Sequence, residues 1–159
     1  MIYNIIKIIL MTFLPFLELR ASIPYGILIL KENWILVFFI CIITNIILGI
    51  ILFPLIDTII SILTKIKFIK KIYNYYVIKT QKKIMKYVDK YGEIGIALFI
   101  GIPLPGSGVY SGALGANIIG LKYKKFIIAN ILGVLIAGII VTIIVLSGNN
   151  AFSFFIKTL

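Results

Sequence analysis

Three long runs without a charged side chain constrain this sequence more than any other feature. They cover residues 33–56, 94–121 and 126–156, and each is longer than the roughly 20 residues that cross a bilayer as a helix. With 62% apolar residues and a mean hydropathy of +1.17, the 159-residue chain is too apolar for a soluble domain of this size. The sequence therefore predicts an all-α integral membrane protein, and we expect it in the cell membrane.

The charged residues separate these runs instead of covering a polar surface. The net charge of +11 could indicate a nucleic-acid partner, because basic chains of this size often bind phosphate backbones. The 16 lysines and arginines, however, fall between the apolar runs, as the positively charged loops of membrane proteins do. We therefore expect no nucleic-acid partner.

The sequence offers little material for catalysis or metal binding. It contains no histidine and one cysteine, Cys41, so neither a Ser-His or Cys-His pair nor a Cys/His metal site can form. We expect no catalytic residues, no cofactor and no metal, and we expect that the protein is not an enzyme.

The first apolar stretch is interrupted at residues 18–26, which read Glu-Leu-Arg-Ala-Ser-Ile-Pro-Tyr-Gly. Two opposite charges, a proline and a glycine in nine positions predict a broken helix or the tip of a helical hairpin. A short apolar arm to Leu30 and a long span over residues 34–63 follow. The first half is therefore expected to be a re-entrant hairpin followed by a transmembrane helix.

This interruption also carries candidate functional residues. Ionisable groups inside a membrane are costly unless paired or hydrated, which makes them candidates for function. We assign Glu18, Arg20, Ser22 and Pro24 to a substrate or ion site. Arg20 could grip a phosphate or carboxylate with its fork of donors, and Glu18 could carry a coupling proton or a cationic group. The alternative is a structural ion pair that fixes a hairpin tip.

The second half repeats this pattern with different residues. An apolar arm over residues 94–102 is followed by Pro-Leu-Pro-Gly-Ser-Gly and a second arm to Leu121. The arms rise about 14 and 21 Å as helices, whereas the hydrocarbon core is near 30 Å thick, so a second re-entrant hairpin is expected. The positions assigned to the substrate or ion site here are Pro103, Pro105, Gly106 and Ser107. A tight turn without a ligand is the alternative.

Charge placement orients the two halves. Lysines lie before the second hairpin and directly after it, so a hairpin that returns to its own side keeps both groups cytoplasmic. Ser22 and Tyr25 also match Ser107 and Tyr110 at a spacing of 85 residues. We therefore predict one membrane domain with an inverted repeat, comprising repeat 1 at about residues 5–63, a linker at 64–93 and repeat 2 at about 94–148.

The linker has the pattern of an amphipathic helix on the cytoplasmic membrane surface. Apolar residues recur at helical spacing, and lysines line the other side. Membrane lipids are the expected partner, and a solvated linker helix is the alternative. The lysines assigned to the membrane surface are Lys79, Lys82, Lys83, Lys86 and Lys90.

Small and polar residues indicate how the helices pack. Gly108, Gly112, Ala116 and Gly120 form a stripe with a period of four residues, which lets another helix approach closely. Asn45 and Asn130 are expected to form interhelical hydrogen bonds. Because two hairpins and two spans provide little protein to cover polar tips, we expect a homodimer.

These motifs resemble those of a known family. The segment at 18–26, Ile-Pro-Leu-Pro-Gly-Ser-Gly-Val-Tyr-Ser-Gly-Ala at 102–113 and the Leu-Lys-Tyr-Lys-Lys turn before the last span resemble the small multidrug export proteins. That family looks like a distant branch of the DedA (SNARE-associated/VTT) superfamily, whose members pair re-entrant hairpins and are implicated in lipid movement. The arginines that DedA proteins place around the second hairpin are absent, with Ile100 and Gly106 near those positions.

The resemblance implies transport, and together with the residues it defines the expected function. We expect a polytopic transporter that moves an amphipathic, anionic lipid-type substrate, such as a lipid carrier phosphate, through facing hairpins with proton coupling. A small multidrug exporter of lipophilic cations and a membrane scaffold without transport activity are the alternatives.

Overall fold

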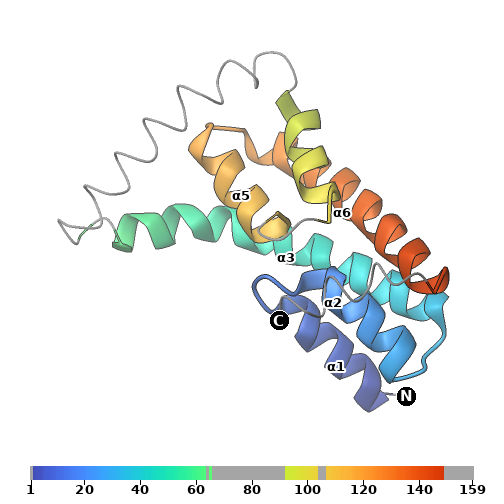
Figure 1. Cartoon of the computed structure of the whole chain (residues 1–159). Coiled ribbons are helices and arrows are strands. Elements are labelled where there is room, and N and C mark those ends of the chain that lie inside the picture. Colours follow the sequence, from blue (N-terminus) through green and yellow to red (C-terminus); the bar gives the residue numbers. More distant parts are fainter. Residues whose placement is uncertain (1, 64, 66–91, 104–106, 149–159) are drawn as a thin grey trace.

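The computed structural model describes residues 2–63, 65, 92–103 and 107–148. Every regular element in these ranges is a helix, which confirms the expected all-α class. The elements are α1 (Ile2–Phe13), α2 (Glu18–Pro24), the π-helix η1 (Tyr25–Ile29), α3 (Trp34–Leu63), an unlabelled helix Gly92–Gly101, α5 (Val109–Ile118) and α6 (Tyr123–Leu146) (Figure 1). Each long helix is thus preceded by a pair of short ones.

The two long helices are apolar enough to cross a membrane. The qualifying segments are Trp34–Ile56 within α3 and Tyr123–Leu146, which is all of α6. They run antiparallel, because positions that rise along α6 meet positions that fall along α3. The contacts that show this are the ring of Phe126 stacked on Phe53 (centroids 4.4 Å apart), Asn130 bonded to Ile46, and Gly138 against Ile42.

The first pair of short helices turns earlier than the sequence suggested. Residues 18–26 were expected to be a broken helix or a hairpin tip, but Glu18–Pro24 is helical and the turn lies at residues 14–17. Pro24 keeps helical dihedrals (φ −58°, ψ −42°), and the helix continues as η1. A proline removes one backbone donor, and here the chain responds by widening into a π-helix rather than by reversing direction.

The second pair is interrupted where the sequence predicted. The first helix of this pair ends at Gly101 and α5 begins at Val109, so neither crosses a bilayer alone. Within the intervening segment, Pro103 and Ser107 are described, whereas the candidate residues Pro105 and Gly106 lie outside the described residues. The linker and its five candidate lysines also lie outside them.

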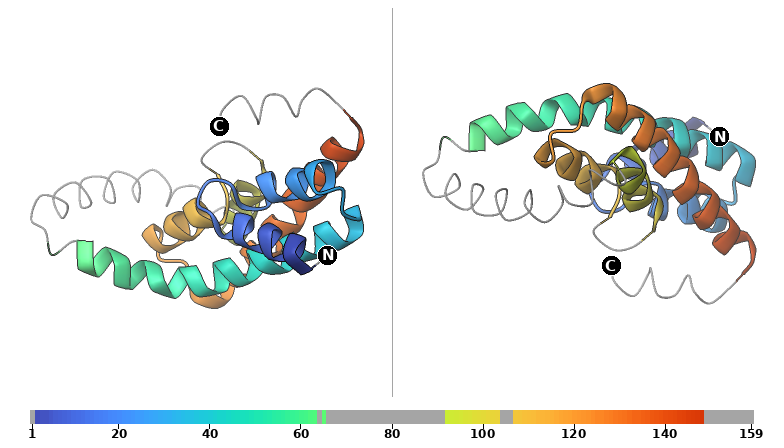
Figure 2. Two further views of the ribbon diagram at one scale, coloured as in Figure 1. Left: turned by 90° about the horizontal axis from the view of Figure 1, so that it is seen from below. Right: turned by 90° about the horizontal axis from the view of Figure 1, so that it is seen from above.

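The open ends of the two pairs lie at opposite ends of the molecule. Asn4 Nδ2 donates to Glu32 Oε1 at 2.8 Å, which places the start of α1 beside the start of α3. Lys125 Nζ lies 2.8 Å from Glu93 Oε1, which places the start of the second pair beside the start of α6. Because α3 and α6 are antiparallel, the open ends of the two pairs lie at opposite ends of the molecule, and α2 and α5 lie between these ends (Figure 1, Figure 2).

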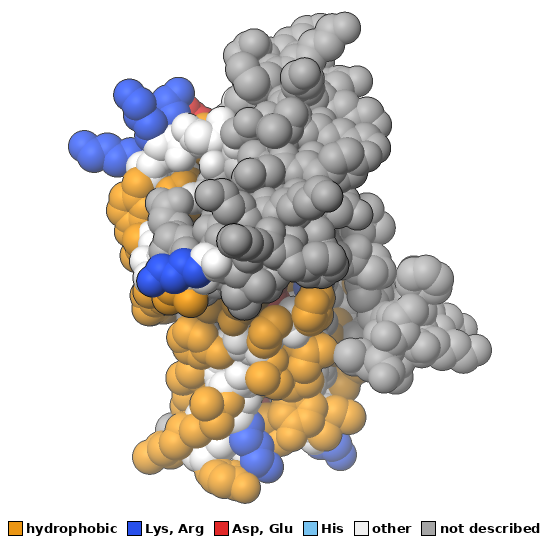
Figure 3. Space-filling view, turned by 90° about the vertical axis from the view of Figure 1, so that its left-hand side faces the viewer, with side chains coloured by type: hydrophobic (Ala, Val, Ile, Leu, Met, Phe, Trp, Pro, Cys, Tyr) orange, Lys and Arg blue, Asp and Glu red, His pale blue; other side chains and the backbone are white. Residues whose placement is uncertain are grey.

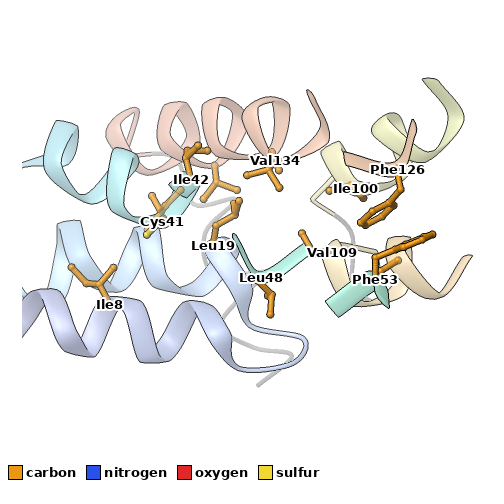
Figure 4. Close-up of a cluster of buried hydrophobic side chains, with 14 of the residues drawn as sticks. Ile8, Leu19, Cys41, Ile42, Leu48, Phe53, Ile100, Val109, Phe126 and Val134 are labelled. Atoms are coloured by element: carbon orange, nitrogen blue, oxygen red, sulfur yellow. The ribbon is translucent and has the colours of Figure 1, made fainter. Parts of the chain in front are cut away.

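The core is small, and the outer faces of the long helices are apolar. Ile8, Leu19, Val109 and Val134 are fully buried or nearly so in a cluster shared by both halves (Figure 4). Figure 3 shows apolar side chains over much of one described face, with basic side chains mainly toward the top and bottom of that view. Apolar surface of this extent is unusual on a soluble monomer and indicates a membrane protein. The exposed apolar residues of the long helices include Phe39, Ile43, Ile47, Ile51, Ile128, Leu132, Ile139 and Ile143.

Candidate functional site

Two buried charges lie where the turns of the two helix pairs meet. Glu18 and Arg20 lie on α2 and are 3% and 9% exposed. They are the buried charged residues among the side chains that the structure describes. Both make hydrogen bonds to residues of the second pair, which lie 82 to 92 positions away in the sequence.

The Glu18 carboxylate caps the amino end of α5. Its Oε2 accepts a hydrogen bond from the backbone N–H of Val109 at 3.0 Å, and its Oε1 accepts one from Tyr110 N–H at 3.3 Å. The first N–H groups of a helix have no partner within the helix, and the helix dipole favours a negative charge there. The chain therefore supplies its own anion to these donors.

Gly108 makes room for this carboxylate. Its backbone has φ +123° and ψ −170°, a region essentially restricted to glycine. A Cβ at this position would lie 2.6 Å from Glu18 Oε2 and 2.9 Å from the carboxyl carbon. The sequence placed Gly108 in a helix-packing stripe, but the structure places it against the charged group.

Arg20 holds the other side of the same segment. Its Nη1 donates to the Ser107 carbonyl at 2.7 Å, and its Nη2 donates to Ser107 Oγ at 2.8 Å. Ser107 Oγ in turn donates to the Ile102 carbonyl at 2.6 Å. The planar fork of a guanidinium suits such paired acceptors, so Arg20 fixes both ends of the break between Gly101 and Val109.

The backbone at Glu18 is strained. Its φ is +47°, in the left-handed region that costs an L-residue about 1–2 kcal/mol. Its N–H donates to the Leu14 carbonyl at 3.2 Å, which closes the turn after α1. The hydrogen bonds to α5 offset this cost, because residues persist in such conformations only where their surroundings hold them.

A third tie joins the same two turns. The Tyr110 hydroxyl donates to the Phe13 carbonyl at the end of α1, at 2.6 Å. Sequence reasoning used Tyr110 only as a repeat match and did not identify the N–H groups of Val109 and Tyr110 as partners of Glu18. The sequence did indicate that a helix with free N–H groups begins directly after Gly-Ser-Gly. It did not indicate which acceptor would bind those N–H groups.

Two candidate residues of the first pair belong to its packing. Ser22 is fully buried, with Oγ 2.7 Å from Thr12 Oγ1 and 3.2 Å from Cys41 Sγ. These contacts join α1, α2 and α3. Pro24 is buried inside α2. The hydrogen bonds of Ser22 to Thr12, Cys41 and the Glu18 carbonyl thus remain in the first half, whereas Ser107 binds Arg20 across the two halves.

The predicted small-residue stripe is used mainly inside the chain. A Cβ on Gly112 would lie 2.5 Å from Ile100 Cγ1, and one on Gly133 would lie 2.6 Å from Ile100 Cβ, so Ile100 fits between α5 and α6. Ala116 is fully buried. Gly120 instead has φ +71° and nothing within 4 Å of its Cβ position, so it serves the turn before α6 rather than helix packing.

The two asparagines lie in the interior of the long helices. Asn130 Nδ2 donates to the Ile46 carbonyl of α3 at 3.2 Å, and its amide lies flat on Gly49. Asn45 is 1% exposed. Within the described ranges, Oδ1 of Asn45 and Oδ1 of Asn130 have no hydrogen-bond partner.

The chemistry available at this site is that of one carboxylate, one guanidinium, a hydroxyl and backbone dipoles. The described residues contain no group of three or more histidine, cysteine, aspartate or glutamate side chains that could hold a metal. The arrangement can bind a charged group or hold two helix pairs together.

Comparison with protein families identifies the chain. The sequence model of the family described as "Putative small multi-drug export protein" matches residues 18–140. This match covers more than half of the 159 residues, and the chain belongs to that family. The matched region begins at Glu18 and includes the residues named above in the contact between the pairs, except Phe13. Comparisons with curated proteins and with solved structures gave no match.

Proposed function

We propose that this small multidrug export protein is a membrane transporter that moves an amphipathic, lipid-type molecule past the contact between its two helix pairs. The observation that carries the proposal is the buried meeting of Glu18 and Arg20 with Ser107, Val109 and Tyr110. Charged groups are costly inside an apolar protein and mark pathways in membrane proteins. The family name, which describes export, agrees with transport rather than catalysis.

The arrangement of helices supports two re-entrant hairpins in an inverted repeat. The pairs enter from opposite ends, each is followed by a long apolar helix, and those helices are antiparallel. Transporters of this kind bind substrate near the midplane, between repeats and at broken helices. The contact lies between the two helix pairs and beside the interruption of the second pair, which supports a substrate site at this place.

The donors at the contact favour an anionic headgroup as substrate. Glu18 accepts hydrogen bonds from the backbone N–H groups of Val109 and Tyr110. The guanidinium of Arg20 donates to the Ser107 carbonyl. A phosphate or carboxylate offers the same kind of oxygen acceptors. A lipophilic cation, with Glu18 as its counter-charge, is the second candidate because of the family's description.

Reconstitution tests this proposal and separates the two substrates. Vesicles containing the full chain are loaded with a fluorescent anionic phospholipid or with a lipophilic cationic dye, and translocation is followed with and without a pH gradient. We expect movement of the anionic lipid, slowed in Arg20→Lys because lysine keeps the charge but loses the fork. Movement of the dye alone would identify a cation exporter. Movement of neither molecule would contradict the transport proposal and favour a membrane scaffold.

A second experiment tests the membrane topology. We propose a cell-membrane protein, assembled as a homodimer, with its basic linker in the cytoplasm. Cysteine labels replacing Lys31 and Lys157 should react from outside, and labels replacing Lys83 and Lys124 only from inside. If Lys83 and Lys124 report opposite sides, the second pair crosses the membrane and is not re-entrant.

A further inference from the structure

The contact between Glu18 and α5 joins two helix pairs that each also pack on the long helices. The first pair is fixed to α3 by the contacts of Ser22 with Thr12 and Cys41 and by Gly26, whose Cβ position lies 2.7 Å from Val37 Cγ1. The second pair is fixed to α6 through Ile100. α2 also packs on α6, and α5 also packs on α3. These packing contacts are separate from the hydrogen bonds of Glu18, so they can persist when the carboxylate leaves the amides.

We infer that the Glu18 carboxylate is a releasable latch, which closes the path between the two helix pairs and must leave α5 before substrate passes. This inference rests on the proposed transport function and concerns the regulation of the same site. It assigns Glu18 a closing role in which it binds the protein's own backbone donors. The α5 end of the latch consists of backbone N–H groups only.

The backbone at Glu18 favours release of the latch. Glu18 has φ +47°, a left-handed conformation that is costly for a residue with a Cβ. Such conformations occur where surroundings enforce them, and they cluster at switch regions. When the carboxylate leaves, Glu18 can return to an ordinary backbone conformation, which partly offsets the lost hydrogen bonds.

The charge of Glu18 is what keeps the latch closed. Hydrogen bonds to an ionised acceptor are roughly twice as strong as neutral ones, and the amino end of α5 favours a negative charge. In Glu18→Gln the side chain keeps its length, but only one of its two terminal atoms can accept a hydrogen bond. The substitution should therefore weaken the hold of residue 18 on α5 and raise the open population, while the packing of each pair and the bonds of Arg20 and Tyr110 remain.

Distances between a spin label on the turn of the first pair and one on α5 test the latch directly. Phe16, 84% exposed, and Leu114, 42% exposed, take the labels in the full chain in lipid nanodiscs, with Cys41→Ser as background. Minor states are commonly about 0.1–10% populated, so roughly tenfold weakening brings an open population into measurable range. We expect one short distance in the parent and a second, longer one in Glu18→Gln.

A matched control removes another carboxylate from the same helix pair. Glu32→Gln changes a group that accepts from Asn4, at the opposite end of the pair from the latch, and should keep the parent's distance distribution. A Glu18→Gln distribution identical to that of the parent would overturn the inference. If Glu18→Gln does not fold, Glu18→Asp replaces it, because the shorter side chain cannot reach both amides; an unchanged distribution there overturns the inference equally.

Transport by the closed state separates this inference from the proposed function. A cleavable bismaleimide, matched to the parent's short distance, joins cysteines at Phe16 and Leu114. We expect translocation to stop in the cross-linked protein and to return on cleavage. If the parent transports and the cross-linked protein does so equally fast, the latch is wrong and the function stands. If the parent transports nothing, the function fails, while the distances still report whether Glu18 holds the turns together.

Discussion

The two helix pairs share an order of elements but contribute opposite halves of the chemistry. The pair formed by α1 and α2 carries the charged side chains, Glu18 and Arg20. The pair formed by Gly92–Gly101 and α5 has no charged residue between positions 94 and 121 and presents backbone groups and the hydroxyls of Ser107 and Tyr110. A charge buried by one pair is thus matched by dipoles of the other, and neither half would be satisfied alone.

The serines at matching positions show how far this difference extends. Ser22 and Ser107 are 85 residues apart and were matched by the repeat spacing. Ser22 contacts Thr12 and Cys41 inside the first half, whereas Ser107 binds Arg20 across the two halves. A repeat in the order of elements therefore does not imply a repeat in function.

The largest effect should come from neutralising one charge. Glu18→Gln and Arg20→Gln should each lower the free energy of unfolding by roughly 3–5 kcal/mol, because each leaves the other charge buried and uncompensated. The double variant should recover only part of this loss, since the bonds to Val109 and Ser107 are separate. Unfolding of the four proteins in lipid bicelles measures these energies. Full recovery of stability in the double variant would mean that the two charges stabilise the protein only through their mutual attraction. It would contradict the claim that each charge is matched by groups of the other pair.

The next largest effect should come from Gly108→Ala. Alanine at φ +123° costs about 1–3 kcal/mol in backbone strain, and its Cβ would also collide with the Glu18 carboxylate. We expect a loss of about 3 kcal/mol in the same unfolding assay. Gly115→Ala is the matched control in α5, with nothing within 4 Å of its Cβ, and should be neutral or stabilising by about 0.5–1 kcal/mol. Equal effects at both glycines would show that the Glu18 carboxylate does not require a glycine at position 108.

Smaller effects are expected where the second pair packs by close approach. Gly112→Ala and Gly133→Ala should each cost about 1–3 kcal/mol, because an added methyl group overpacks the interface with Ile100. Ile100→Ala should rescue Gly112→Ala, because the atoms nearest to the added methyl group belong to the Ile100 side chain. It should not rescue Gly133→Ala, whose Cβ would also lie 2.7 Å from the Ala97 carbonyl oxygen. Rescue of both variants would contradict the backbone contact.

The smallest effect should distinguish the matched serines. Ser22→Ala should cost about 1 kcal/mol and leave translocation unchanged, because it removes one hydrogen-bonding hydroxyl from packing. Ser107→Ala should cost about 1.5–3 kcal/mol, since its hydroxyl binds a charged group, and it should also alter translocation. Equal effects of the two substitutions on both stability and translocation would contradict the different roles assigned to Ser22 and Ser107.

Sequence reasoning located the elements well and the contacts poorly. The long spans and the break before Ser107 were predictable, because apolar run length and paired prolines act locally. The turn of the first pair was predicted within residues 18–26 but lies at residues 14–17. Two charges and one proline did not end the helix there, because the charged side chains find hydrogen-bond partners in the second pair. The membrane nature of the protein followed from composition, and its family membership followed from motifs that the sequence displays directly.

The sequence by itself determined the apolar spans, the interruptions between them and the presence of two charges that an apolar chain must accommodate. The tertiary structure alone decided that Glu18 meets the amides of Val109 and Tyr110, that Arg20 meets Ser107, and that Ser22 meets neither. Helix length and hydropathy depend on neighbouring residues, whereas the partner of a buried charge depends on how antiparallel helices bring segments together across about half the chain. Backbone N–H groups are present at every residue except proline, so no sequence pattern marks the two that a carboxylate will find.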